Sequence, residues 1–191
     1  MMPLVLMPGL LCDGRLWRHQ AEGLADLAGQ ILIPDVTGGD SMAGLARDIL
    51  EAAPERFALA GLSMGGYVSL EVMRQAPKRV EALALLDTSA RPDTPEQTEA
   101  RFALVELARG GRFDQVWQGL PPKGVLPDGI DEPGIRSVVR EMAHTVGPEG
   151  FERQERAIIA HPDSRPDLAG HLLPHPRPIR MRGRPRACTR I

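Results

Sequence analysis

The sequence has few cysteines, little net charge and no long apolar run, and each shortage excludes a class of protein. Two cysteines, Cys12 and Cys188, are too few and too far apart for a disulfide framework or a zinc site. A formal net charge of −2 gives no reason to bind nucleic acid or an anionic membrane. No apolar stretch could span a bilayer, and the N-terminal run is a poor signal peptide, interrupted at Pro8. We therefore expect a cytoplasmic protein without nucleic-acid or membrane partners.

What is present suggests one domain with a real hydrophobic core. The chain has 191 residues, of which 42% are apolar, a normal share for a globular protein. The charge is unevenly spread along it. Residues 168–191 hold six arginines and no acidic residue, which leaves 17 basic and 25 acidic side chains in residues 1–167.

Strand and helix patterns alternate along the first 90 residues. Short, continuous apolar runs bounded by turn residues predict buried strands, and periodic segments between them predict helices. The strands are expected at 3–7, 30–34, 56–60 and 80–86, and the helices at 16–27, 42–53 and 64–75. Alternation with short connections favours an α/β fold with a parallel sheet and helices on both faces. We take residues 1–90 as this core.

A block of helices follows the core without any strand pattern. Thr94-Pro95-Glu96-Gln97 is a capping box with proline at the first helical position, which predicts a helix to about Arg109. Further helices are expected at about 112–118, 132–146 and 149–161. We interpret residues 91–165 as a helical cap over the carboxyl edge of the sheet, where such folds bind ligands.

One motif in the core carries chemistry. Gly61-Leu62-Ser63-Met64-Gly65 has the form G-x-S-x-G and lies between a predicted strand and a predicted helix without spare residues. In that context a sharp turn exposes the serine oxygen as a nucleophile. Glycines on either side give room for a strained backbone. The alternative is an ordinary turn in which Ser63 caps the helix.

Two backbone amides are expected to bind an oxyanion near Ser63. The N–H of Met64, at the start of the helix, is the first of these. The second should come from the loop after the first strand, Pro8-Gly9-Leu10-Leu11, and we choose Leu10. The alternative is a plain strand-to-loop turn. No metal-ligand cluster or phosphate-binding loop is present, so we expect no cofactor and no metal.

Four segments together resemble the α/β-hydrolase superfamily, in particular its small bacterial esterase-like members with a helical cap. They are Leu-Met-Pro-Gly-Leu-Leu-Cys-Asp (6–13), Ile-Pro-Asp (33–35), Gly-Leu-Ser-Met-Gly-Gly-Tyr (61–67) and Leu-Leu-Asp-Thr (85–88). The resemblance covers residues 3 to about 169. It implies a Ser-His-Asp triad in which acid and histidine follow the serine, each on a loop after a further strand.

The histidines and acids of this chain depart from that pattern. None of the five histidines follows a predicted strand; they are His19, His144, His161, His171 and His175. Asp87 does follow a strand, and some members of the superfamily take their acid from this position, but it is equally a turn residue. The triad partners of Ser63 are therefore not identified.

The family pattern expects a strand near residue 172, where this chain is rich in proline and arginine. We expect residues 166–191 to form a disordered tail. Codons for 171–177, read one base later, can encode Ile-x-Cys-Pro-Thr-Leu-Val, which fits the expected strand. Our hypothesis is a truncation or frameshift near codon 170 that leaves the fold incomplete; the alternative is a natural basic tail.

These observations predict a serine hydrolase of small carboxylic esters or thioesters. Apolar cap residues favour such substrates, including the aromatic side chains of Phe102, Phe113, Phe151 and Trp117. Without its acid and histidine the chain should be impaired. Two alternatives stay open: a non-catalytic protein that binds a ligand in a hydrolase-like site, and another reaction of the superfamily, such as a lyase or haloperoxidase-like reaction. The oligomeric state is not indicated.

Overall fold

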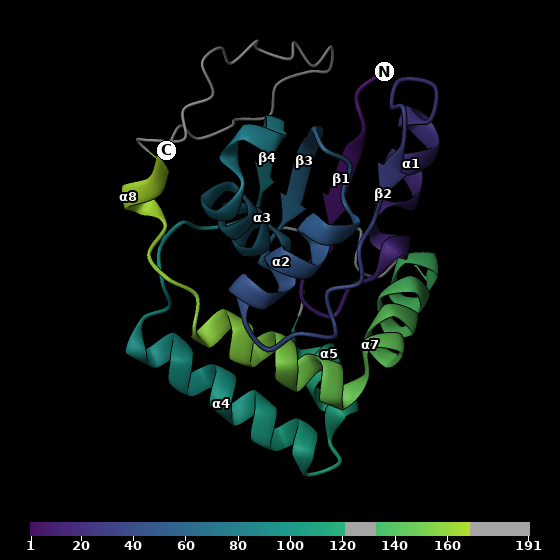
Figure 1. Ribbon diagram of the computed structural model, residues 1–191. Coiled ribbons are helices and arrows are strands. Elements are labelled where there is room, and N and C mark those ends of the chain that lie inside the picture. The colour runs from purple at the N-terminus through teal and green to yellow at the C-terminus, as the bar shows by residue number, and fades with distance from the viewer. Residues whose placement is uncertain (121–132, 169–191) are drawn as a thin grey trace, which may run out of the picture.

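A parallel four-stranded sheet forms the centre of the molecule (Figure 1). The computed structural model describes residues 1–120 and 133–168. Within them the strand order is β2-β1-β3-β4, and every neighbouring pair is parallel. The strands are β1 (Leu4–Met7), β2 (Ile31–Leu32), β3 (Phe57–Leu62) and β4 (Val80–Leu86). The predicted parallel sheet is confirmed.

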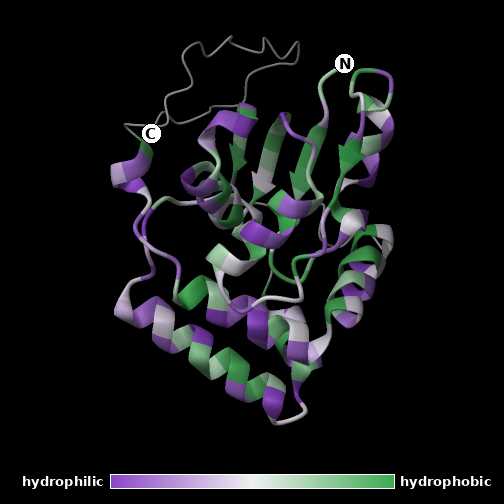
Figure 2. Ribbon diagram, viewed as in Figure 1, coloured by the Kyte–Doolittle hydropathy of each residue, from purple (hydrophilic) through white to green (hydrophobic). Residues whose placement is uncertain are grey.

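The crossover helices α2 (Met42–Ala52) and α3 (Met64–Gln75) pack against each other beside this sheet (Figure 1). Ser41 starts α2 as predicted, because its hydroxyl accepts the N–H of Gly44 at 3.2 Å. Both helices turn apolar side chains toward the strands, which are largely hydrophobic in Figure 2. The resulting core cluster includes Met7, Phe57, Leu59, Met64 and Val68. A short turn of helix, η2 (Pro77–Arg79), leads from α3 into β4.

Two of the predicted elements are shorter than expected. The helix predicted to reach residue 27 is a 3-10 turn, η1 (Gly14–Trp17), followed by α1 (Arg18–Leu24), and Leu27 is 71% exposed. None of the residues of α1 is buried, so this segment does not pack an apolar face against the core. The strand predicted at 30–34 reduces to the two half-buried residues of β2. Within the described residues β2 is an edge strand that pairs with β1 alone, so it lacks the burial expected of it.

Helices α4 (Pro95–Arg109), α5 (Phe113–Gly119) and α7 (Pro133–Ile159) lie together at the end of the sheet toward which the strands run (Figure 1). The capping box of α4 is confirmed at Thr94 and Gln97. The two helices predicted at 132–146 and 149–161 are the halves of α7. They are separated by a break at Gly147, where φ is 68°, and Pro148 follows at once. No strand lies among the described residues after β4.

Helix α7 contributes to two apolar clusters. Ala143 and Val146, before the break, and Phe151, just after it, join α4 and α5 in a second apolar cluster. Ala157 and Ile158, from its second half, pack with the sheet instead. The chain then forms the short helix α8 (Arg165–Leu168), which contains the first residues of the predicted tail; residues 169–191 lie outside the described part of the chain.

A buried ion network joins the start of α4 to the second half of α7. The Arg101 guanidinium contacts Asp93 at 2.5 Å and Glu155 at 2.9 Å, and the Glu155 side chain is fully buried. Burial raises the pKa of the Glu155 carboxyl, while Arg101 acts in the opposite direction. Removing the cation would leave two carboxylates without their partner in a nearly dry site.

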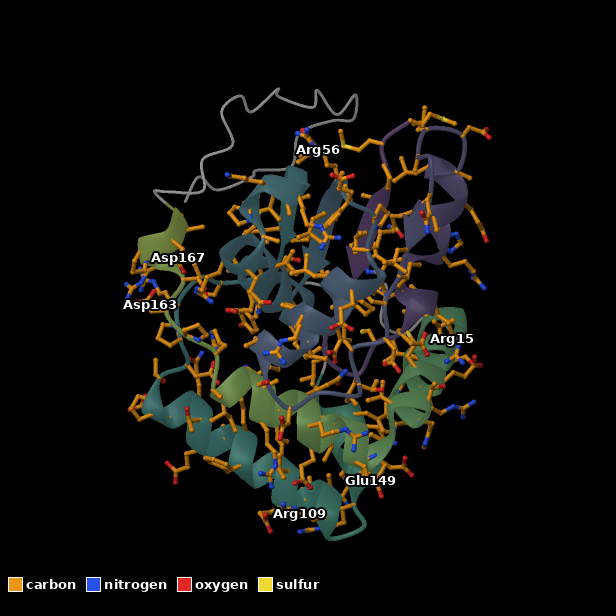
Figure 3. The ribbon with its side chains drawn as sticks, viewed as in Figure 1. Arg15, Arg56, Arg109, Glu149, Asp163 and Asp167 are labelled. Atoms are coloured by element: carbon orange, nitrogen blue, oxygen red, sulfur yellow. The ribbon has the colours of Figure 1, made fainter. Side chains whose placement is uncertain are left out.

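We expect Arg101→Met to lower the free energy of unfolding by about 3–5 kcal/mol, because a buried charge then lacks compensation. Urea denaturation at pH 7 measures this loss, which should shrink at pH 5 as Glu155 takes up a proton. Arg109→Met is the control on the same helix. Arg109 pairs with Glu106 and Glu152 at the exposed outer side of the cap (Figure 3), so its loss should matter little. Equal losses in the two variants would contradict this account.

Candidate active site

The register of the sheet brings three loops to one edge. Met7 of β1 pairs with Gly61 of β3, and Leu62 pairs with Leu86 of β4. The residues that follow these strands therefore meet. Ser63 donates its N–H to the carbonyl of Leu86 at 2.9 Å, and the Thr88 hydroxyl donates to the carbonyl of Ser63 at 2.8 Å. The backbone of Ser63 is fixed on both sides by the end of β4.

Ser63 itself has a strained backbone at the turn from β3 into α3. Its φ is 52° and its ψ is −115°, in a region that a residue with a Cβ rarely adopts. The side chain makes no capping hydrogen bond to the helix that follows. This geometry does not support the alternative in which Ser63 is simply a helix cap. Strain of this kind persists where the surrounding structure over-determines it, often at functional sites.

The glycines around Ser63 are required by close backbone approach. A Cβ on Gly65 would collide with the carbonyl oxygen of Met7 and stand 2.6 Å from that of Pro8. A Cβ on Gly61 would collide with the carbonyl of Gly65, and one on Gly66 with the side chain of Thr88. The role of Gly66 as the contact surface of Thr88 depends on a residue 22 positions away, so the motif alone does not reveal it.

We expect Gly65→Ala to push the loop after β1 away from Ser63, because the new methyl group meets two backbone carbonyls. The thermal midpoint should fall by several degrees, with a loss of about 1–3 kcal/mol typical of overpacking. Gly23→Ala is the matched control: it lies in α1 with nothing within 4 Å of its Cβ position, so it should be neutral or slightly stabilising. Equal thermal midpoints for the two variants would refute the close-approach argument.

The amides near Ser63 can be sorted by what they already bind. In the turn after β1, Cys12 donates its N–H to the carbonyl of Gly9 at 3.1 Å, and Leu11 donates its N–H to Oε1 of Gln154 at 3.0 Å. Met64 is the first residue of α3, so its N–H has no acceptor within the helix. The Leu10 and Met64 amides, named from the sequence as oxyanion donors, stay predictions.

Cys12 also holds this loop through its side chain. Its thiol donates to the carbonyl of Leu10 at 3.4 Å, and burial raises the pKa of the thiol to about 11. A thiol with so high a pKa is almost fully protonated at neutral pH and is a poor nucleophile. Cys12 therefore supports the loop and does not compete with Ser63.

The described histidines after Ser63 have other partners. Nε2 of His144 lies 3.4 Å from Oδ1 of Asp114 in the cap, next to the rings of Phe113 and Trp117. His161 is buried, with both ring nitrogens at carbonyl oxygens, those of Ile158 and Arg91. His19 is exposed in α1, and His171 and His175 lie outside the described residues. Within the described part of the chain, no hydrogen bond joins a histidine to Ser63.

Asp87 occupies the position expected from the sequence, directly after β4. It is exposed and has a positive φ of 42°, which aspartate tolerates better than most residues. Nothing in the described chain pairs it with a histidine, so its role as an acid remains a prediction. Within residues 1–120 and 133–168, no three His, Cys, Asp or Glu side chains gather as metal ligands.

The aromatic side chains of the cap differ in how far they are buried. Phe113 and Phe151 are buried against each other inside the cap cluster, with ring centroids 6.0 Å apart. Phe102, on α4, is 53% exposed. Two of the four aromatic residues predicted to favour apolar substrates therefore stabilise the cap itself.

Among the described helices, none is both long and apolar enough to cross a bilayer.

Comparison with curated proteins gives partial matches to esterases. A pimeloyl-[acyl-carrier protein] methyl ester esterase of Vibrio parahaemolyticus is 31% identical over 97 residues, which is 46% of this chain and 37% of that protein. The protein of the same name from Vibrio campbellii is 24% identical over 86% of this chain and 63% of its own length. The matches thus span less than two thirds of these relatives. No protein-family model matches the sequence.

Solved structures match over most of the chain. A thermophilic esterase from Thermogutta terrifontis superposes with a TM-score of 0.76 and 28% identity, covering 88% of this chain and 66% of that one. The enol-lactonase from Burkholderia xenovorans gives a TM-score of 0.77 and 25% identity, covering 89% and 69%. Both superpositions agree with the α/β fold described above.

Proposed function

We propose that this chain, a member of the α/β-hydrolase superfamily, carries the nucleophile of a serine esterase, and that this nucleophile is Ser63. The observation that carries the proposal is the backbone of Ser63, with φ of 52° between β3 and α3 and with glycines at every close approach. Such a turn presents the hydroxyl at the end of the sheet and at the start of a helix, where anionic charge is favoured.

In this proposal the reaction proceeds through an acyl-enzyme. The Ser63 oxygen attacks the ester carbonyl as its proton passes to a histidine, and the carbonyl oxygen becomes an oxyanion held by the Leu10 and Met64 amides. The alkoxide leaves with the proton from the histidine. Water then attacks the acyl group by the same route in reverse, which releases the carboxylic acid and restores Ser63.

We place the histidine and the acid beyond residue 168. His144 lies within the cap beside Phe113 and Trp117, and both ring nitrogens of His161 are taken by backbone carbonyls. Within the described residues neither histidine has a hydrogen bond to Ser63, which argues against either as the base. The esterase and the enol-lactonase that superpose on this chain are both longer than the matched part. Small carboxylic esters are the proposed substrate class, since the partial relatives bear the name of a methyl ester esterase. Thioesters react by the same chemistry and stay within the proposal.

Covalent labelling tests the nucleophile directly. A fluorophosphonate should modify the full 191-residue protein on Ser63, identified by mass spectrometry of the peptide, and Ser63→Ala should abolish this label. Labelling should be slow, because an oxyanion hole without its base leaves about 10³–10⁴ of rate enhancement over water. If wild type and Ser63→Ala label alike, the esterase proposal fails, and a non-catalytic ligand-binding protein becomes the better description.

The gene sequence beyond codon 170 tests where the triad is completed. We expect the reading frame one base later to continue Ile-x-Cys-Pro-Thr-Leu-Val into an acid and a later histidine. The protein translated in that frame should hydrolyse 4-nitrophenyl acetate at least about 10³-fold faster than the 191-residue chain. A frame that reads on unchanged, without a later histidine, would contradict this placement while leaving the Ser63 labelling result intact.

A further inference from the structure

The turn that carries Leu10 is held from two directions. On one side, the Cys12 N–H bonds the carbonyl of Gly9 and the Cys12 thiol bonds the carbonyl of Leu10. On the other, the N–H of Leu11 bonds Gln154. Leu11 has a φ of 58°, a conformation that glycine adopts freely and leucine does not. The contact with Gln154 therefore supports a turn that the local sequence would not choose alone.

Gln154 reaches this turn from the second half of α7. The side chain is fully buried, and both ends of its amide are used: Oε1 accepts the Leu11 N–H, and Nε2 donates to the carbonyl of Val36 at 3.3 Å. One partner is a donor and the other an acceptor, so only one orientation of the amide satisfies both. A buried amide is costly unless it is paired in this way. An apolar residue could fill the space but could not orient the turn.

The turn matters because it lies beside the nucleophile. The Cβ position of Gly9 is 3.7 Å from the Cβ of Ser63. The N–H of Leu10 shares a rigid peptide plane with the carbonyl of Gly9, which Cys12 fixes, and the next peptide plane is fixed by Gln154. Both planes that flank the Leu10 α-carbon are thus set by hydrogen bonds, so the direction of the Leu10 N–H is set as well.

We propose that Gln154 is a positioning residue that aims the Leu10 N–H at the oxyanion formed on Ser63. The inference rests on the proposed function and extends it, since it makes α7, a helix of the cap, a support of the oxyanion site. Gln154 does not touch the reacting atoms. Its effect passes through the Leu11 amide and the turn.

Two substitutions separate this role from simple packing. Gln154→Leu keeps the bulk and removes both hydrogen bonds. Gln154→Glu keeps an acceptor for Leu11 but, when ionised, cannot donate to Val36; when protonated, its carboxyl group again offers one donor and one acceptor. Arg153→Leu is the matched control. Its guanidinium donates to the carbonyl of Thr37 at 2.7 Å from the neighbouring position of α7, without contact to the turn.

The first readout is independent of catalysis. In protein labelled with 15N-leucine, the exchange rate of the Leu11 amide with solvent should rise at least about 10-fold in Gln154→Leu, because an amide without its acceptor exchanges readily. The Leu59 amide, in the middle of β3, is the internal reference and should not change. Arg153→Leu should leave Leu11 protected. An unchanged Leu11 amide in Gln154→Leu overturns the inference whatever the labelling shows.

The second readout is the rate at which a fluorophosphonate labels Ser63, whose phosphoryl oxygen would occupy the oxyanion site. Gln154→Leu should label about 10- to 100-fold more slowly, since a misaimed donor loses much of the value of an oxyanion-hole bond. Arg153→Leu should stay within about twofold of wild type. If Leu11 loses protection but labelling is unchanged, Gln154 supports only the fold of the turn, and the positioning role is refuted.

Gln154→Glu completes the test and covers the case in which Gln154→Leu does not fold. At pH 6, where its buried carboxyl group takes up a proton, the variant again offers one donor and one acceptor, so its Leu11 amide should stay protected and its labelling rate should stay within about twofold of wild type. A Gln154→Glu variant that protects Leu11 as wild type does but labels Ser63 more than about 10-fold more slowly overturns the inference. If wild type is not labelled at all, the proposed function fails, and the Leu11 exchange result still reports on the hydrogen bond itself.

Discussion

The close approach of two backbones, that of α3 at Gly65 and that of β1 at Met7 and Pro8, is the constraint on which the site depends. No side chain fits between them, so the helix begins directly against the carbonyls of the first strand. That contact brings the turn after β1 beside Ser63. Because Ser63 is the single residue between β3 and α3, it has to adopt a strained conformation to join them. The hydrogen bonds from Ser63 to Leu86 and from Thr88 then hold the strain in place.

The helices of the cap also help to hold the turn after β1 in place. Its buried network of Arg101, Asp93 and Glu155 ties α4 to the second half of α7. One turn of that helix also carries Gln154, whose amide reaches both the turn after β1 and the segment after β2. The ion pair of Glu155 therefore helps to hold the turn of helix from which Gln154 makes its hydrogen bonds.

Much of the fold followed from local patterns. The strands at β1, β3 and β4, the α2 and α4 caps at Ser41 and Thr94, and the strand–Ser63–helix order were all predictable, because each rests on a few neighbouring residues. The shortness of β2 was not, since an edge position depends on strand order. Gln154 gave no signal either. It lies among charged residues in a helix, and its importance comes from Leu11 and Val36, which are more than 100 positions away.

The break in α7 at Gly147 has a consequence for exchanging caps between related proteins. Ala143, Val146 and Phe151, on either side of the break, pack with α4 and α5, whereas Ala157 and Ile158 belong to the core of the sheet. A graft that took the whole helix from a donor would replace part of the recipient's own core and its contact with the turn after β1. Junctions at Thr94 and just after Phe151 would transplant the whole cap cluster without the residues of the sheet core. The natural unit of recombination is thus smaller than the run of helices suggests.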